Sequence, residues 1–117
     1  MRTRVLLLLL VAAAPLAADE SADRQIDFGL KVAQQGLWQE ARFRFERAVV
    51  AEPGNAAALN NLAVALEQMG EFDAARAAYE KALEIKPGDL YVQQNYDLFR
   101  EADDKRNRKA RRKKAQP

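Results

Sequence analysis

The chain has 117 residues, which is enough for one small domain, and it has no cysteine and no histidine. Its 19 Lys and Arg and 17 Asp and Glu leave a formal net charge of only +2. The absence of cysteine excludes a disulfide framework, a lipid anchor attached through cysteine and every site that depends on a thiolate.

The first residues have the three-part layout of a secretory signal peptide. Two arginines precede an apolar run over residues 5–14, and small residues then stand ahead of Asp19. An uncleaved anchor is the alternative, but a membrane-spanning helix needs about 20 apolar residues and this run is too short. We therefore predict a signal peptide over residues 1–18, cut after Ala18 or after Ala17. Assuming a bacterial source, the mature protein is expected to be exported, to the periplasm or the extracellular space.

Few side chains that could support catalysis remain after this cleavage. Residues 19–117 contain no Thr and a single Ser, Ser21, so the common nucleophiles and the common proton shuttle are missing. Asp103 and Asp104 are adjacent, point about 100° apart on a helix and have no glycine-bearing metal loop around them. We interpret them as part of a solvated face. No glycine-rich phosphate loop is present, and we expect no enzymatic activity, no metal and no cofactor.

One segment of the chain recurs after 34 residues. The pairs that share this offset are Gly36 and Gly70, Trp38 and Phe72, Ala41 and Ala75, Phe45 and Tyr79, Ala48 and Ala82, Pro53 and Pro87, and Gly54 and Gly88. Apolar spacing in the second copy predicts one helix over 56–69 and another over 71–85, separated by a glycine that ends the first. The alanines let the two helices of a copy approach closely, and the aromatic ring of each copy fills the space beside them.

This pattern resembles the tetratricopeptide repeat, a helix-turn-helix unit of about 34 residues in which small, aromatic and proline positions recur. The resemblance covers two copies, at about 22–55 and 56–89. It implies an all-α helical solenoid that acts as a non-enzymatic protein-protein interaction module. The first copy departs from the family pattern near its start, where Gln25 stands in place of the usual aromatic residue.

A third unit begins at about residue 90 but has no second helix. Residues 90–104, with Asp89 as the N-cap, are predicted to be a capping helix that covers the last repeat with a polar outer face. The repeat domain is thus expected over 19–104. Two and a half repeats are fewer than the three that such arrays usually need, so a partner or a second copy of the chain is expected to add stability.

The charge changes sharply after residue 104. Residues 19–104 carry nine Lys and Arg against 17 Asp and Glu, whereas residues 105–117 carry eight bases and no acid. Because like charges resist compaction, this tail is predicted to be disordered or a frayed helix. It is either a solubilising end or a site for an anionic envelope component or lipid, and nucleic acid is not an expected partner outside the cytoplasm. The residues of this candidate anionic-surface site are Lys105, Arg106, Arg108, Lys109, Arg111, Arg112, Lys113 and Lys114.

In the tetratricopeptide repeat family the first helix of each unit lines a concave groove. The resemblance therefore implies a peptide-binding groove whose candidate residues are Asn60, Asn61, Val64, Gln68, Tyr91, Gln94, Asn95 and Leu98, beside Ile26, Asp27 and Leu30 of the first unit. Asn61 and Asn95 are equivalent positions one repeat apart, and carboxamides can pair with the main chain of an extended peptide.

The same resemblance indicates what the groove does not bind. Chaperone-binding family members hold a terminal carboxylate with a clamp of Lys, Arg and Asn, and Asn61 is the one member of that clamp present here. Acidic residues near the groove favour a neutral or basic segment. The leading interpretation is an exported adaptor or scaffold that binds a polypeptide. The alternative is a surface-associating protein whose basic tail is the active part and whose repeats are a spacer or dimerisation unit.

Overall fold

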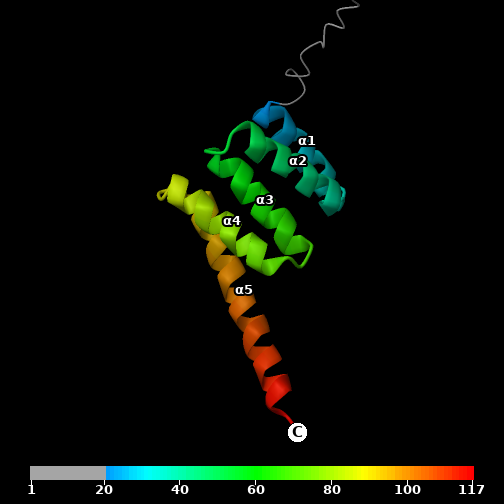
Figure 1. Ribbon diagram of the computed structural model, residues 1–117, viewed down its shortest axis with the longest axis vertical. Helices are drawn as coiled ribbons and strands as arrows, with labels where there is room; N and C mark the ends of the chain where they lie inside the picture. Colours follow the sequence, from blue (N-terminus) through cyan, green and yellow to red (C-terminus); the bar gives the residue numbers. More distant parts are fainter. Residues whose placement is uncertain (1–20) are drawn as a thin grey trace, which may run out of the picture.

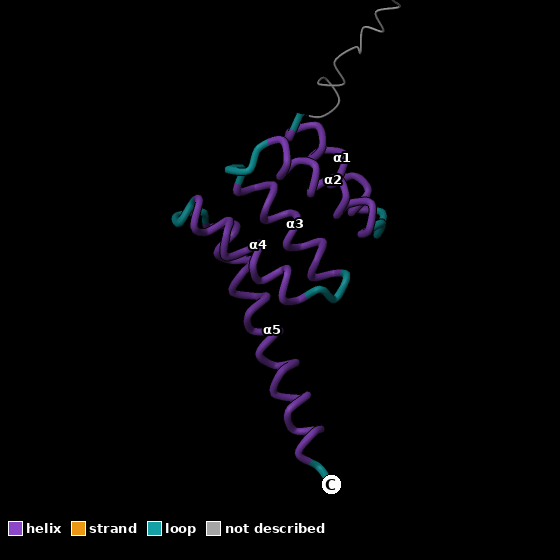
Figure 2. The backbone as a smooth tube through the Cα atoms, viewed as in Figure 1, coloured by secondary structure: helices purple, strands orange, loops and turns teal. Residues whose placement is uncertain are grey.

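The structure is a computed structural model that describes residues 21–117, and this range contains five α-helices and no strand (Figure 1). The helices are α1 (Ala22–Gln34), α2 (Trp38–Ala51), α3 (Ala56–Gln68), α4 (Phe72–Ile85) and α5 (Leu90–Ala115). α1 packs on α2, α2 on α3, α3 on α4 and α4 on α5, so successive helices form a curved stack (Figure 2). The predicted all-α solenoid of two helix pairs and a capping helix is confirmed. The predicted signal peptide lies outside the described residues.

Side-chain caps begin the first helix of every unit at intervals of 34 residues. Ser21 accepts a hydrogen bond from the amide of Arg24, and Asn55 accepts one from the amide of Ala58. Asp89 accepts two, from amides in the first turn of α5. These bonds satisfy amide groups that have no partner within the helix, which fixes where α1, α3 and α5 start.

Glycine makes the turn between the two helices of each repeat. Gly36 and Gly70 have φ values of 75° and 76°, in the left-handed region that costs other residues energy. Each glycine therefore ends the first helix and lets the second return along it.

Small residues and aromatic rings together form the contact between paired helices. Ala41 and Ala75 are fully buried, and Phe45 and Tyr79 are 2% and 1% exposed. In the first pair the ring of Phe45 lies so close to Gly29 that a Cβ built there would be 2.5 Å from a ring carbon. The helices of a pair can approach this closely because the residue facing the ring is small.

α5 is held to the second repeat by aromatic contacts. The rings of Tyr79, Tyr96 and Phe99 lie with their centroids 5.4 to 6.4 Å apart. On the outer side of α5 the apolar residues of α3 are replaced by polar ones: Gln93 stands where α3 has Leu59, and it donates a hydrogen bond to Asp97. This polar side is what a capping helix requires.

α5 does not end near residue 104 but continues to Ala115, for 26 residues in all. The expected change from helix to a disordered or frayed tail is therefore not seen at this boundary. The segment contains no Gly or Pro before Pro117, its Lys, Arg and Ala residues are good helix formers, and cations favour the C-terminal end of a helix. The helix propensity of these residues and their favourable interaction with the helix end outweigh the repulsion between like charges. Although α5 is long, no helix of the described residues is apolar enough to cross a membrane.

We expect Gly29→Ala to destabilise the protein by about 1 to 2 kcal/mol, because the clash with the Phe45 ring exceeds the gain in helix propensity. The matched control is Gly54→Ala, which has no atom within 4 Å of the added Cβ and should stay within about 0.5 kcal/mol of the parent. Chemical denaturation measures both. Equal stability of the two variants would contradict the packing described for the first repeat.

Candidate functional site: the inner face and the basic helix

The first helices of the three units lie side by side on one face of the stack. α3 packs against both α1 and α5, whereas no Cα of α2 comes within 8 Å of one in α4. The stack is therefore closed on the side of α1, α3 and α5 and spread on the side of α2 and α4. We call the surface of α1, α3 and α5 the inner face.

α3 exposes one narrow stripe on this face. Ala57, Asn61, Val64 and Gln68 are the positions of the stripe, and their spacing of three and four residues places them in one line along the helix. Neighbouring helices cover most of the remaining surface of α3. Three of the candidate groove residues thus lie together on this stripe, and none of its four residues is charged.

A hollow of about 220 Å³ lies between this stripe and α1. Its lining residues are Leu30, Ala33, Gln34, Trp38, Phe45, Asn61 and Val64. Phe45 is 2% exposed and lies at the bottom, while Asn61 is half-buried and Gln34 is exposed at the opening. Sequence reasoning missed Ala33, Gln34, Trp38 and Phe45 as site residues. The helical spacing from Leu30 points to Gln34, but nothing in the sequence shows that residues from α2 reach the inner face.

The junction between α3 and α5 is built differently. The amide nitrogen of Asn95 donates a hydrogen bond of 3.1 Å to the amide oxygen of Asn60, and Asn60 is only 9% exposed. The assignment of Asn60 to an open groove is therefore wrong, because α5 packs over it. Asn95 is half-buried and bonded across the junction, so it is not the free equivalent of Asn61.

The other candidate residues of α5 are on the surface. Tyr91 and Leu98 are 79% and 63% exposed, and Gln94 is exposed as well. None of the three lines the hollow. Glu67, an acidic residue of α3, accepts a 3.0 Å hydrogen bond from the hydroxyl of Tyr79. Burial, together with the charge of Glu67, raises the pKa of Tyr79 far above its ordinary value.

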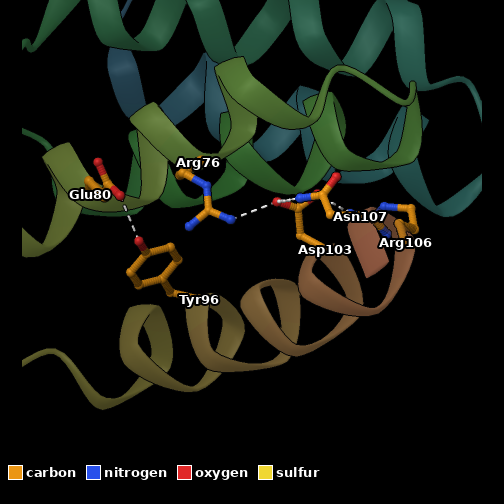
Figure 3. Close-up of polar contacts among 6 residues, drawn as sticks. All are labelled: Arg76, Glu80, Tyr96, Asp103, Arg106 and Asn107. Atoms are coloured by element: carbon orange, nitrogen blue, oxygen red, sulfur yellow. Dashed lines mark hydrogen bonds and ion pairs between the residues drawn. The ribbon is translucent and has the colours of Figure 1, made fainter. Parts of the chain in front are cut away.

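A buried carboxylate fixes the direction in which α5 leaves the repeats (Figure 3). The interpretation of Asp103 as part of a solvated face is wrong, because its side chain is only 6% exposed and receives hydrogen bonds from Arg76 at 2.6 Å and from Arg106 at 3.1 Å. The guanidinium group of Arg106 also lies 3.5 Å from the ring centroid of Phe72 on α4. Chiefly through its bond with Arg76, the pKa of Asp103 is lowered below the ordinary value. We call this group the Asp103 cluster.

Beyond the Asp103 cluster the basic residues surround the helix. Successive residues turn by about 100°, so the cations after residue 107 point in all directions and leave no apolar side. All of them are exposed. Arg106 is the exception among the candidate cations, because it is partly buried in the cluster and serves the α4–α5 contact.

Residues 21–117 contain no group of three Asp, Glu, His or Cys side chains arranged to hold a metal ion. Two features of the described surface are a small apolar hollow with carboxamides at its opening and a separate helical segment of positive charge. Both are suited to binding a macromolecule.

The geometry is that of a helical-repeat protein, a stack of helix pairs with one binding face. Residues 26–89 match the tetratricopeptide repeat family, and the chain belongs to that family. No curated protein sequence matches the chain. Domains of this family bind protein or peptide partners and are generally non-catalytic.

Solved structures with the same fold include the Sgt2 TPR domain from Aspergillus fumigatus, with a TM-score of 0.73 and 20% identity over 78% of this chain and 62% of that one. A crystal structure of MamA has a TM-score of 0.67 and 31% identity over 75% of this chain and 52% of that one. A second MamA structure has a TM-score of 0.66 and 29% identity, over 79% and 50%. The chain thus spans half to about three fifths of the length of these relatives.

We expect Asp103→Asn to destabilise the protein at pH 7 by about 1.5 to 3 kcal/mol, since Arg76 and Arg106 lose a charged acceptor. The pKa of Asp103 is lowered in the folded state, so its stabilisation is complete above the unfolded value of about 3.9 and is lost as the pH falls below that. Urea denaturation should therefore show the parent and the variant converging in acid. The control is Asp104→Asn, an exposed neighbour. Equal effects of the two substitutions at pH 7 would contradict the role given to the cluster.

Proposed function

We propose that this protein is an exported adaptor whose inner face holds a segment of a partner polypeptide. The observation that carries the proposal is the hollow between α1 and α3, with the carboxamide of Asn61 at its opening. An extended peptide presents both donors and acceptors along its main chain, and a carboxamide can pair with either. The family supports binding of a polypeptide in general, and the choice of the inner face is ours.

The partner segment is neutral or basic in this proposal. The exposed stripe of α3 is uncharged, Asp23 and Asp27 lie on α1, and Glu101 lies on α5. The clamp that grips a terminal carboxylate in chaperone-binding relatives would need cations at Ile26, Tyr91 and Asn95. An acidic peptide end therefore lacks this cationic clamp on the described inner face.

A second function is favoured by the helical basic segment. The cations from Arg108 to Lys114 stand clear of the repeats on a continuous helix, and their all-round distribution suits an anionic surface that attracts charge without inserting an apolar face. In this alternative the segment attaches the protein to an anionic envelope component or lipid, and the repeats are a spacer or dimerisation unit.

Capture of partners from the native envelope extract distinguishes these functions. We expect the parent and a variant cut after Asn107, which keeps Arg106 in the Asp103 cluster, to capture the same polypeptide. Asn61→Ala should weaken its binding about two- to ten-fold through loss of a hydrogen bond. Raising the salt from 0.1 to 1 M shortens electrostatic screening from about 10 to about 3 Å and should change this capture little. If the cut variant loses the target and salt abolishes capture, the basic segment carries the function.

Export is tested separately, on the protein from its native cell. We expect the mature chain to begin at Asp19, or one residue earlier, because charged, apolar and small-residue regions occur in that order before it. N-terminal sequencing measures this directly. A chain that keeps Met1 or Arg2 and fractionates with the cytoplasm would refute the proposal of export while leaving the adaptor proposal open.

A further inference from the structure

We infer that the hollow between α1 and α3 is a pocket for one apolar side chain, the size of leucine or phenylalanine, in a bound polypeptide segment that carries Lys or Arg beside this anchor. The inference rests on the proposed function and specifies its ligand. The inner face then selects its partner chiefly at one position rather than along its whole length.

The size and lining of the hollow fit such an anchor. Its volume of about 220 Å³ exceeds the roughly 150 Å³ of an apolar cavity that holds benzene. Leu30, Ala33 and Val64 supply apolar walls above the rings of Trp38 and Phe45, and the two polar lining residues are both carboxamides. Leu30 is 43% exposed, so its contact surface is only partly used by the fold itself.

Comparison of the α1–α3 and α3–α5 junctions shows why the α1–α3 junction is open. At the second junction Asn60 and Asn95 bond to each other and close the contact between α3 and α5. One repeat earlier the equivalent positions are Ile26 and Asn61. Ile26 cannot form that bond, and the carboxamide of Asn61 makes no hydrogen bond to any residue from 21 to 117. The repeat thus places an unused donor and acceptor at the opening of the hollow, where a peptide main chain would meet them.

The charge of the surrounding surface favours a basic neighbour for the anchor. Asp27 lies one turn before Leu30 on α1, and Asp23 lies one turn before Asp27. The stripe of α3 opposite them has no charge, and residues 19–104 as a whole carry eight more acids than bases. Lys31 is the nearby cation on α1, and it supplies a control of opposite sign for the test.

The protein offers a direct signal for occupation of the hollow, because Trp38 is its only tryptophan and lines it. Random peptides displayed on phage can be selected on the purified protein, and the strongest binder made synthetically. We expect selected peptides to share a Leu, Ile, Met or Phe with Lys or Arg within two residues, and to shift the emission of Trp38. Changing the anchor to Ala should weaken binding about ten- to one-hundred-fold, measured by calorimetry.

Variants of the protein make the assignment specific. Val64→Phe fills the hollow, and Leu30→Ala, at a half-exposed position that the fold tolerates, removes one wall; both should weaken the selected peptide and reduce the Trp38 response. Leu98→Ala, outside the hollow, should leave the response intact. Asp27→Asn should weaken binding about two- to five-fold, as an exposed charge pair does, whereas Lys31→Gln should not weaken it.

Three results would overturn the inference, and they differ in whether the adaptor proposal survives. Peptides that bind without changing Trp38 emission, are insensitive to Val64→Phe and weaken with Leu98→Ala would place the ligand elsewhere on the inner face, so the adaptor proposal survives. Selected peptides rich in Asp or Glu, or lacking an apolar anchor, would overturn the ligand chemistry in the same way. If no peptide is enriched and the extract yields no partner, both the inference and the proposed function fail.

Discussion

The close approach of two helices around an aromatic ring is the contact on which the rest of this structure depends. Phe45 and Tyr79 are almost fully buried between paired helices, and each can be there only because the residues facing it are glycine or alanine. This contact sets the angle within each pair. The angle then determines how the pairs stack, and the stacking brings α1, α3 and α5 together on one face.

The inner face is asymmetric because different residues stand at its two helix junctions, α1–α3 and α3–α5. Position for position, Ile26 and Asn61 at the first junction correspond to Asn60 and Asn95 at the second. An amide pair closes one junction, and an isoleucine leaves the other with a hollow and an amide at its edge. Repeats of the same fold therefore form two different junctions, and the hollow lies at the first of them. The second junction instead helps to hold the capping helix against α3.

The residues that recur in both repeats predicted the fold well, because each of them meets one local requirement of the backbone or of helix packing. A positive φ requires glycine at residues 36 and 70, and a close helix contact requires alanine at 41 and 75. The bond between Asn60 and Asn95 could not be predicted in this way, since both residues have polar side chains that suit solvent equally well. The hollow escaped prediction because its volume depends on side chains from three helices at once.

The continuation of α5 beyond residue 104 also could not be predicted from the sequence. Mutual repulsion of the cations argued for a disordered or frayed tail after residue 104, and sequence reasoning had no measure of the interactions that oppose this repulsion. The structure supplies them: Asp103 holds Arg76 from α4 and Arg106 from the next turn of α5, so the helix is anchored just before its charge begins. From there no residue interrupts the helix up to Ala115.

Because α5 continues as one helix, the positive end of the chain cannot fold back on the acidic repeats that precede it. A helix advances about 1.5 Å per residue, so the segment after Asn107 extends roughly 12 Å further from the body. The six excess acids of residues 21–104 and the six bases that follow Asn107 are thus kept apart in space. The molecule has a large permanent electric dipole directed along α5. Near a negatively charged surface, such a dipole orients the basic end of α5 toward the surface and the repeats toward solution.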